Sequence, residues 1–200
     1  MEKLIVLQRS EEMITDYFHQ FIFGFIYHDI ERCIEARANY LVALALLSYT
    51  EYLGGLASGN LGLVGKSQKN FEKALDFFPQ EYKQIDSSIL IQDVDEDGKQ
   101  ILDNKGKPKQ KTGIYHLFRC GMVHEYFIRG FATVYNDPSG LAKNHIGIVK
   151  AERLIEWPKE YKIPPYTNKV LEFHTNEYFR DFKLAVDKIF KMLIIDKNQG

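Results

Sequence analysis

The stretch from Tyr40 to Tyr49, YLVALALLSY, constrains the fold of this chain more than any other. On a helix of this sequence, apolar side chains point in nearly every direction, so other elements must cover most of its sides. The longest uninterrupted apolar run, Tyr40–Leu47, is far shorter than the roughly 20 residues that span a bilayer. We therefore expect a central core helix and no membrane segment.

The helical pattern extends on both sides of this stretch, from Ser10 to Ala57. Apolar residues before it recur at the i, i+3, i+4 spacing of one buried helix face. Gly24 and the pair His28-Asp29 suggest a break or bend, and Gly54-Gly55 suggests a stop. We predict two long helices here, of which the second is central.

The rest of the chain alternates between helical patterns and turn-rich segments. Segment 82–111 contains turn sequences and is predicted to pair Ser87–Ile91 with Gln100–Leu102. Residues 146–149 lie within segment 131–170, and they can pair with residues 170–173, at its end and just beyond, as a small β-hairpin. Further helices are expected at about 70–78 (ended by Pro79), at 112–130, and from Thr175 or Asn176 onward. The sequence thus predicts one mainly α domain over residues 1–200, a bundle of four to five helices with a small β-hairpin or irregular insertions at 82–111 and 131–170.

Charge and cysteine content narrow the classes of function. Lysine plus arginine total 26 against 27 acidic residues, which excludes a polybasic protein that coats nucleic acid but leaves room for a local cationic site. The cysteines, Cys33 and Cys120, are too few for a disulfide scaffold or a four-cysteine zinc site. The N-terminus lacks the long apolar core of a secretory signal, so we expect a cytoplasmic protein.

Two segments resemble ligand-binding loops but miss required residues. Asn60–Ser67 is similar to a phosphate-binding loop, yet Asn60 replaces its first glycine and a helix precedes it where a strand is needed. Asp93–Gly98 matches the first half of a calcium loop, but Asn104 stands where a bidentate glutamate is needed. We predict structural loops, with at most weak calcium binding at the second.

His116, Cys120 and His124 recur every fourth residue and share one broad helix stripe. The two histidines lie about 12 Å apart along a helix, too far to share one ion, so we predict no metal site and no cofactor. A His–Cys pair, or Cys120 as a thiolate nucleophile with His124 as its base, stays open as an alternative.

The sequence FRCGMVHEYF places Arg119 and His124 five residues apart on an aromatic helix. Gly121 lies between them, where it costs about 0.8–1 kcal/mol relative to alanine, and this suggests a close backbone approach. On an α-helix, residues five apart point about 140° from each other, so one helix brings such a pair together poorly.

This R-x4-H helix, together with the central helix YLVALALLSYTEYLGG, resembles the HEPN superfamily of all-α domains from toxins, defence systems and RNA processing. The resemblance covers about half of the chain and implies a metal-independent endoribonuclease. His124 would act as the general acid or base on the ribose 2′-hydroxyl, and Arg119 would bind the scissile phosphate. Members pack these helices together in pairs, so the resemblance implies a homodimer with a composite site.

Additional residues and partners follow from the same resemblance. Tyr126 and Arg129 could support the substrate by stacking and by phosphate contact. Independently of the resemblance, the lysines just upstream of this helix, Lys105, Lys107, Lys109 and Lys111, form either a basic arm that follows RNA or a solvated hairpin face. A toxin or defence role would bring an antitoxin or inhibitor protein as partner. Cys120 departs from the polar residue that usually follows the arginine, so the alternative is an inactive dimerisation or ligand- or protein-binding module. A helical domain unrelated to the family, with an incidental Arg/His pair, is the third hypothesis.

Overall fold

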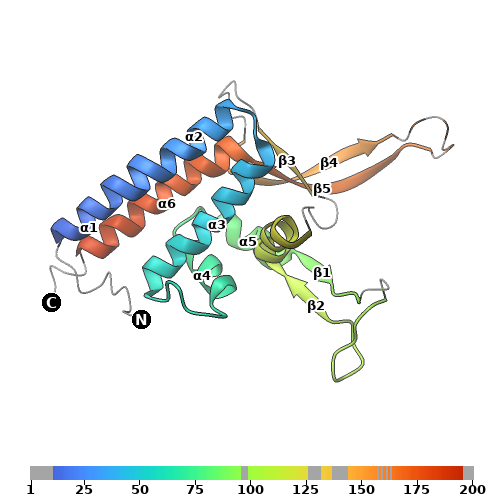
Figure 1. Cartoon of the computed structure of the whole chain (residues 1–200). Helices are drawn as coiled ribbons and strands as arrows, with labels where there is room; N and C mark the ends of the chain where they lie inside the picture. Colours follow the sequence, from blue (N-terminus) through green and yellow to red (C-terminus); the bar gives the residue numbers. More distant parts are fainter. Residues whose placement is uncertain are drawn as a thin grey trace.

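The computed structural model describes residues 11–95, 99–125, 132–136, 144–156, 158, 160, 162 and 164–195, with side chains in the 99–125 segment described as far as residue 123. A body of long helices carries two β-hairpins that extend from one end (Figure 1). The helices are α1 (Glu11–Tyr17), η2 (Phe18–Ile26), α2 (Tyr27–Glu35), α3 (Asn39–Ser58), α4 (Ser67–Ala74), α5 (Gln80–Ser88), η3 (Tyr115–Glu125) and α6 (Thr175–Ile195). The strands are β1 (Leu90–Gln92), β2 (Gln110–Thr112), β3 (Ala132–Tyr135), β4 (Ile148–Ile155) and β5 (Tyr166–His174).

The first three helical segments, α1, η2 and α2, follow one another without a break from Glu11 to Glu35. The expected bend at Gly24 and His28-Asp29 is therefore wrong. The middle segment, η2, is a π-helix, and its wider turn keeps residues four apart near one stripe. The turn comes instead at residues 36–38, where Arg37 has a φ of 57°. The buried stripe consists of Ile14, Phe18, Ile22, Ile26 and Ile30.

The central helix α3 continues through Gly54-Gly55 and ends at Ser58, where Gly59 adopts a φ of 66°. The predicted stop at Gly54-Gly55 is wrong because these glycines allow α4 to approach. A Cβ atom on Gly54 would lie 1.6 Å from the carbonyl oxygen of Asn70. The expectation of a central, covered helix is confirmed from Val42 onward, since Val42, Leu46 and Leu47 are fully buried, whereas Tyr40 and Leu41 at its start are exposed.

Among the described helices, α3 alone has the length and composition of a membrane-spanning helix, with a mean hydropathy of 1.3. Half of that window is buried inside the protein. The core helix of a soluble protein has the same length and composition, and α3 occupies such a position.

The two short helices after α3 differ from the prediction. α4 covers Ser67–Ala74, and α5 begins immediately after Pro79, so residues 80–88 are helical and not part of a hairpin. Proline suits the position before the first helical turn because its missing N–H has no partner there in any case. Tyr82 and Ile85 of α5 are buried, which places the start of the expected insertion in the core.

The first hairpin pairs β1 with β2 antiparallel, with Ile91 opposite Lys111. The predicted pairing of Ser87–Ile91 with Gln100–Leu102 is wrong, because the loop between the strands is longer. Within that loop, isolated bridges join Val94 to Gln100 and Leu102 to Pro108, which are the turns that the Asp- and Lys-rich sequences indicated.

The second sheet has the strand order β3-β5-β4. The antiparallel pairing of β4 with β5 confirms the predicted hairpin, with Ile148 opposite Phe173. β3 runs parallel to β5, a long-range contact without a local sequence signal. Phe173 and Ile148 are fully buried against the helices, so this sheet is part of the core. The prediction of a mainly α bundle with a small insertion is therefore wrong, and the fold is mixed α/β.

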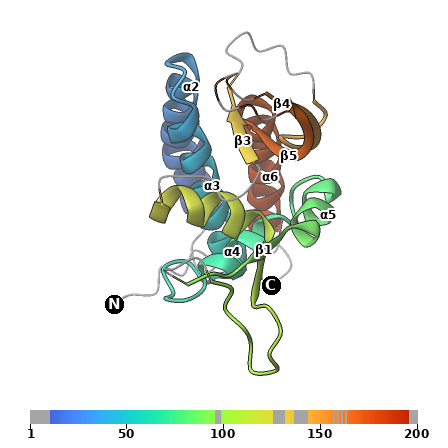
Figure 2. The ribbon, with the colours of Figure 1, turned by 90° about the vertical axis from the view of Figure 1, so that its right-hand side faces the viewer.

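The last helix, α6, begins at Thr175 directly after β5, as the sequence predicts. Its aromatic side chains pack against the first helical segments, with ring centroids 4.8 Å apart for Phe18 and Phe190. Turning the molecule by 90° shows α6 behind the three-stranded sheet and the β1–β2 hairpin extending away from it (Figure 2). β5 and α6 therefore join the sheet to the helical body.

Candidate site around helix η3

The helix that carries Arg119 and His124 is a π-helix over its whole described length, Tyr115–Glu125. A π-helix closes i→i+5 hydrogen bonds and has about 4.4 residues per turn. Five residues then advance the backbone only roughly 50° past a full turn, whereas an α-helix separates them by about 140°. The backbone positions of residues 119 and 124 thus lie near one face of η3. The side chain of His124 lies outside the described residues.

Arg119 extends from η3 to the central helix. Its Nη2 lies 3.1 Å from Oε2 of Glu51 on α3, and both side chains are about four-fifths covered. The guanidinium group also lies over the ring of Tyr115, 5.6 Å from its centroid. The buried Nε of Arg119 has no hydrogen-bond partner among the described residues. Arg119 is thus held between α3 and η3, largely covered and paired with an acidic side chain.

Other polar side chains of η3 contact α4. His116 Nε2 lies 3.2 Å from Oε1 of Gln68. Burial raises the pKa of Tyr115, and the positive charge of Arg119 opposes this shift. On the inner side, Phe118 and Met122 are buried and fix the helix in the core. Gly121 is buried too.

The lysines of the predicted basic arm are partly neutralised. Lys111 Nζ lies 2.9 Å from Asp93 Oδ1, and Lys109 Nζ lies 4.0 Å from the other oxygen of the same carboxylate. Both lysines therefore share one acidic partner at the base of the β1–β2 hairpin. Tyr126 and Arg129, the two other predicted substrate-binding residues, lie outside the described residues.

The two loop-like motifs have structural roles in the described chain. Asn60–Ser67 connects α3 to α4, and its Gly62 and Gly65 have positive φ values of 74° and 73°. Asp93 is engaged by the two lysines, and Asp95 Oδ1 accepts a hydrogen bond from the N–H of Lys99. Residues 96–98 of the calcium-like segment lie outside the described residues. No group of three metal-ligating side chains occurs in the part of the chain that the structure describes.

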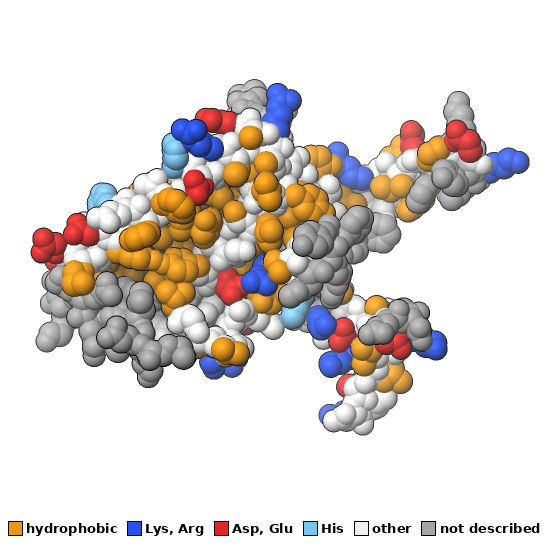
Figure 3. All heavy atoms as spheres, viewed as in Figure 1, with side chains coloured by type: hydrophobic (Ala, Val, Ile, Leu, Met, Phe, Trp, Pro, Cys, Tyr) orange, Lys and Arg blue, Asp and Glu red, His pale blue; other side chains and the backbone are white. Residues whose placement is uncertain are grey.

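Large apolar side chains are exposed on the helical body. Figure 3 shows them gathered over the helical body on the face formed by the first helical segments and α3. Phe21 and Phe25 of η2 are 52% and 58% exposed, and Leu41 of α3 is 61% exposed. We call Phe21, Phe25, Tyr40 and Leu41 the apolar surface. Exposed apolar patches of this kind are typical of protein–protein contacts.

A second polar cluster lies on one face of the three-stranded sheet. Glu172 and His174 alternate along β5 and so share that face. Glu172 is only 4% exposed, accepts a hydrogen bond from Nε of Arg153, and lies 3.1 Å from His174 Nε2. Burial alone would raise the pKa of Glu172, but the hydrogen bonds and charges of Arg153 and His174 outweigh it and lower this pKa. The ring of Tyr135 stacks on His174.

Glu51, Gln68 and the residues of the sheet cluster were not predicted from the sequence. Glu51 and Arg119 are separated by 68 positions, and only the packing of η3 against α3 brings them together. A weak local signal existed for Glu172 and His174, because LEFH alternates apolar and polar residues as a half-buried strand does.

Comparisons with protein-family models, with curated proteins and with solved structures gave no match for this chain.

Proposed function

We propose that the protein is a metal-independent endoribonuclease in which Arg119 and His124 act on the same phosphodiester. The observation that carries this proposal is the π-helical winding of η3, which brings positions 119 and 124 near one helix face. π-helical turns are rare and occur frequently at functional sites. The resemblance of FRCGMVHEYF to the HEPN motif supports the same assignment.

In the proposed reaction, His124 removes the proton of a ribose 2′-hydroxyl, and the 2′-oxygen attacks the adjacent phosphorus. The bond from phosphorus to the 5′-oxygen breaks, and that oxygen takes up a proton. The products are a 2′,3′-cyclic phosphate and a 5′-hydroxyl. Arg119 neutralises the charge that develops on the phosphate oxygens. An unperturbed histidine pKa of about 6.5 suits proton transfer near neutral pH.

A homodimer is part of the proposal. A second copy packed on the apolar surface would cover the exposed side chains of Phe21, Phe25 and Leu41. Two-fold symmetric contacts use the same surface on both copies, so they require only that this surface complement itself. A toxin or defence role with an inhibitor protein, in the cytoplasm, fits a ribonuclease whose activity must be restrained.

The test is cleavage of single-stranded and structured RNA in EDTA by the purified chain. We expect cyclic-phosphate ends by mass spectrometry, and a loss of at least about 100-fold in rate for Arg119→Ala and for His124→Ala. His28→Ala and Arg32→Ala are matched controls, because these residues are also an Arg/His pair on one helix, 2.7 Å apart. Equal cleavage by the wild type and both site variants would assign the activity elsewhere.

The second candidate is a binding module without catalytic activity, and the ion pair between Arg119 and Glu51 favours it. An arginine whose charge is already compensated binds phosphate less strongly. In this case neither RNA cleavage nor its dependence on Arg119 would be observed, while Arg119→Ala would lower the melting temperature. Measuring both quantities on the same variants separates the two functions.

A further inference from the structure

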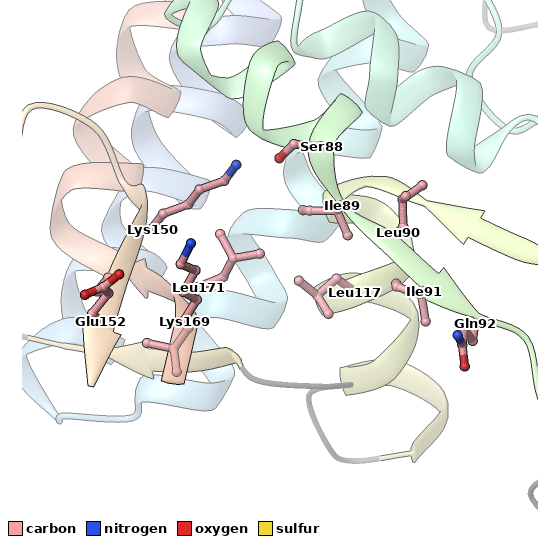
Figure 4. A pocket seen from close by; sticks show the side chains of 12 residues that line it. Ser88, Ile89, Leu90, Ile91, Gln92, Leu117, Lys150, Glu152, Lys169 and Leu171 are labelled. Carbon is pink, nitrogen blue, oxygen red and sulfur yellow. The ribbon is translucent and has the colours of Figure 1, made fainter. Parts of the chain in front are cut away.

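A cavity of about 740 Å³ lies between the base of the β1–β2 hairpin and the three-stranded sheet. One wall is the chain segment Ser88–Gln92, and Leu117 of η3 closes the cavity on one side. The opposite wall consists of Lys150–Glu152 of β4 and Lys169–Leu171 of β5 (Figure 4). The volume is in the range of ligand-binding clefts.

The first wall presents an open strand edge. The N–H of Gly113 donates to the carbonyl of Ile89, and the N–H of Asp93 donates to the carbonyl of Lys109. Residues 89 and 93 therefore direct their backbone groups toward β2, and so does residue 91 between them, which lies opposite Lys111. In an antiparallel pair the alternate residues, Leu90 and Gln92, then point theirs away from β2. Within the described chain no further strand pairs with β1, and no residue of β2 lines the cavity.

The opposite wall supplies positive charge. In the β4–β5 register, Lys150 lies opposite Leu171 and Glu152 lies opposite Lys169, so all four side chains share one face of the sheet. No described carboxylate lies within 4.0 Å of either lysine ammonium group, the limit for an ion pair. The two lysines outnumber Glu152, so the wall carries a net positive charge.

The remaining lining is aliphatic. Ile89 and Leu117 are buried, and Ile91 and Leu171 are half-buried. Among the described lining residues no aromatic ring is present on which a nucleobase could stack. Aliphatic walls beside an open strand edge suit alternating side chains of an extended peptide.

We propose that this cavity binds an extended segment of a protein partner, which adds a strand to β1 and places an acidic side chain against Lys150 and Lys169. Main-chain hydrogen bonds to Leu90 and Gln92 would supply affinity, and the two lysines would select for negative charge. The proposal does not depend on RNA cleavage. Because Leu117 belongs to η3, the bound peptide contacts the same helix that carries Arg119.

The test is selection of random 12-residue peptides displayed on phage against the immobilised full chain, followed by fluorescence anisotropy of the enriched peptides. We expect enriched sequences to alternate apolar and acidic residues. The variant Lys150→Glu/Lys169→Glu should weaken their binding at least tenfold, whereas Lys69→Glu/Lys191→Glu, which makes the same change in charge outside the cavity, should not. The absence of any enriched sequence would overturn the proposal.

A second variant tests the strand addition. Gln92→Pro removes an outward-facing N–H but leaves the bonds between β1 and β2 intact, so circular dichroism should stay unchanged while peptide binding falls at least fivefold. Binding that is insensitive to both cavity variants would contradict the proposal. A single-stranded RNA oligonucleotide that binds in a Lys150- and Lys169-dependent manner and displaces the peptides would instead identify the cavity as an RNA site.

Discussion

Gly54 illustrates how one missing Cβ atom fixes the packing of two helices. In an exposed helix interior, replacing glycine by alanine stabilises by about 1 kcal/mol. At Gly54 the added Cβ would lie 1.6 Å from the Asn70 carbonyl oxygen and 2.9 Å from the Ala74 amide nitrogen. We therefore expect Gly54→Ala to destabilise the protein, lowering the free energy of unfolding by at least about 3 kcal/mol, because α4 must move away from α3. Chemical denaturation monitored by circular dichroism measures this change.

Gly62 provides the matched control for that substitution. Its Cβ would meet nothing within 4 Å, but its φ of 74° is left-handed. Gly62→Ala should therefore cost only the left-handed penalty of about 1–2 kcal/mol. If the two variants were equally stable, close packing at Gly54 would not be the cause.

The R-x4-H motif shows why helix type matters at the residue scale. The same five-residue spacing separates two side chains on an α-helix and aligns their backbone positions on a π-helix. Arg119 gains its contact with Glu51 only through the packing of η3 on α3. The pattern of residues alone determines neither the π-helical winding of η3 nor the contact between Arg119 and Glu51.

At the scale of elements, the polar cluster on β5 joins strands that a local pattern cannot connect. Glu172 bonds to Arg153 on β4 and to His174, whose ring stacks on Tyr135 of β3. The carboxylate thus links all three strands of the sheet. It is nearly buried, so its partners must compensate its charge.

We expect Glu172→Gln to lower the free energy of unfolding at pH 7 by roughly 1.5–3 kcal/mol, as for hydrogen bonds to a charged group. The folded-state pKa of Glu172 lies below its ordinary value of 4.5. Its stabilisation is therefore fully present above that pH and is lost as pH falls through the lowered value. The difference between wild type and variant should shrink toward pH 3 in denaturant titrations.

The exposed Glu156, the residue that follows β4, serves as the control for this pH dependence. Glu156→Gln should leave the stability within about 0.5 kcal/mol at every pH. A difference between wild type and Glu172→Gln that stayed constant down to pH 3 would show that the charge of Glu172 is not responsible.

At the scale of the whole molecule, the apolar surface remains uncovered in one copy of the chain. Phe21, Phe25 and Leu41 are each more than half exposed on helices whose other faces are in the core. We expect the wild type to run at twice its 23.3 kDa mass in light scattering coupled to size exclusion. Phe25→Glu/Leu41→Glu should shift it to the monomer mass, because two buried unpaired charges oppose association.

Leu102 offers a control outside this surface, since it is 55% exposed in the β1–β2 loop. Leu102→Glu should not change the mass. A wild-type protein that stayed monomeric at concentrations well above 10 µM would contradict the proposed homodimer and, with it, a composite site made by two copies.

Several elements were predictable because their signals are local. The run YLVALALLSY indicates a covered helix through its apolar surroundings, and α6 follows from its spacing and its start at Thr175. The β4–β5 hairpin follows from two apolar segments separated by turn residues. The candidate pair Arg119 and His124 was also visible as a motif.

The parts that were not predictable depend on contacts between distant segments. Gly54-Gly55 has the sequence of a helix end, and only the position of α4 makes it a site of close packing. Residues 82–88 have turn-like neighbours, but Tyr82 donates a hydrogen bond to Asp181 of α6, 2.7 Å away, and anchors α5 in the core. The parallel pairing of β3 with β5 has no local pattern at all.

The sequence by itself therefore determined the helical body, the apolar character of α3 and the residues of the R-x4-H motif, because periodicity and composition act within a few turns of chain. The tertiary structure decided that the fold is mixed α/β, that Glu51 pairs with Arg119, and that a charged cavity opens beside β1. These features form between segments far apart in the chain, where the free energy of packing, and not local propensity, selects the neighbours.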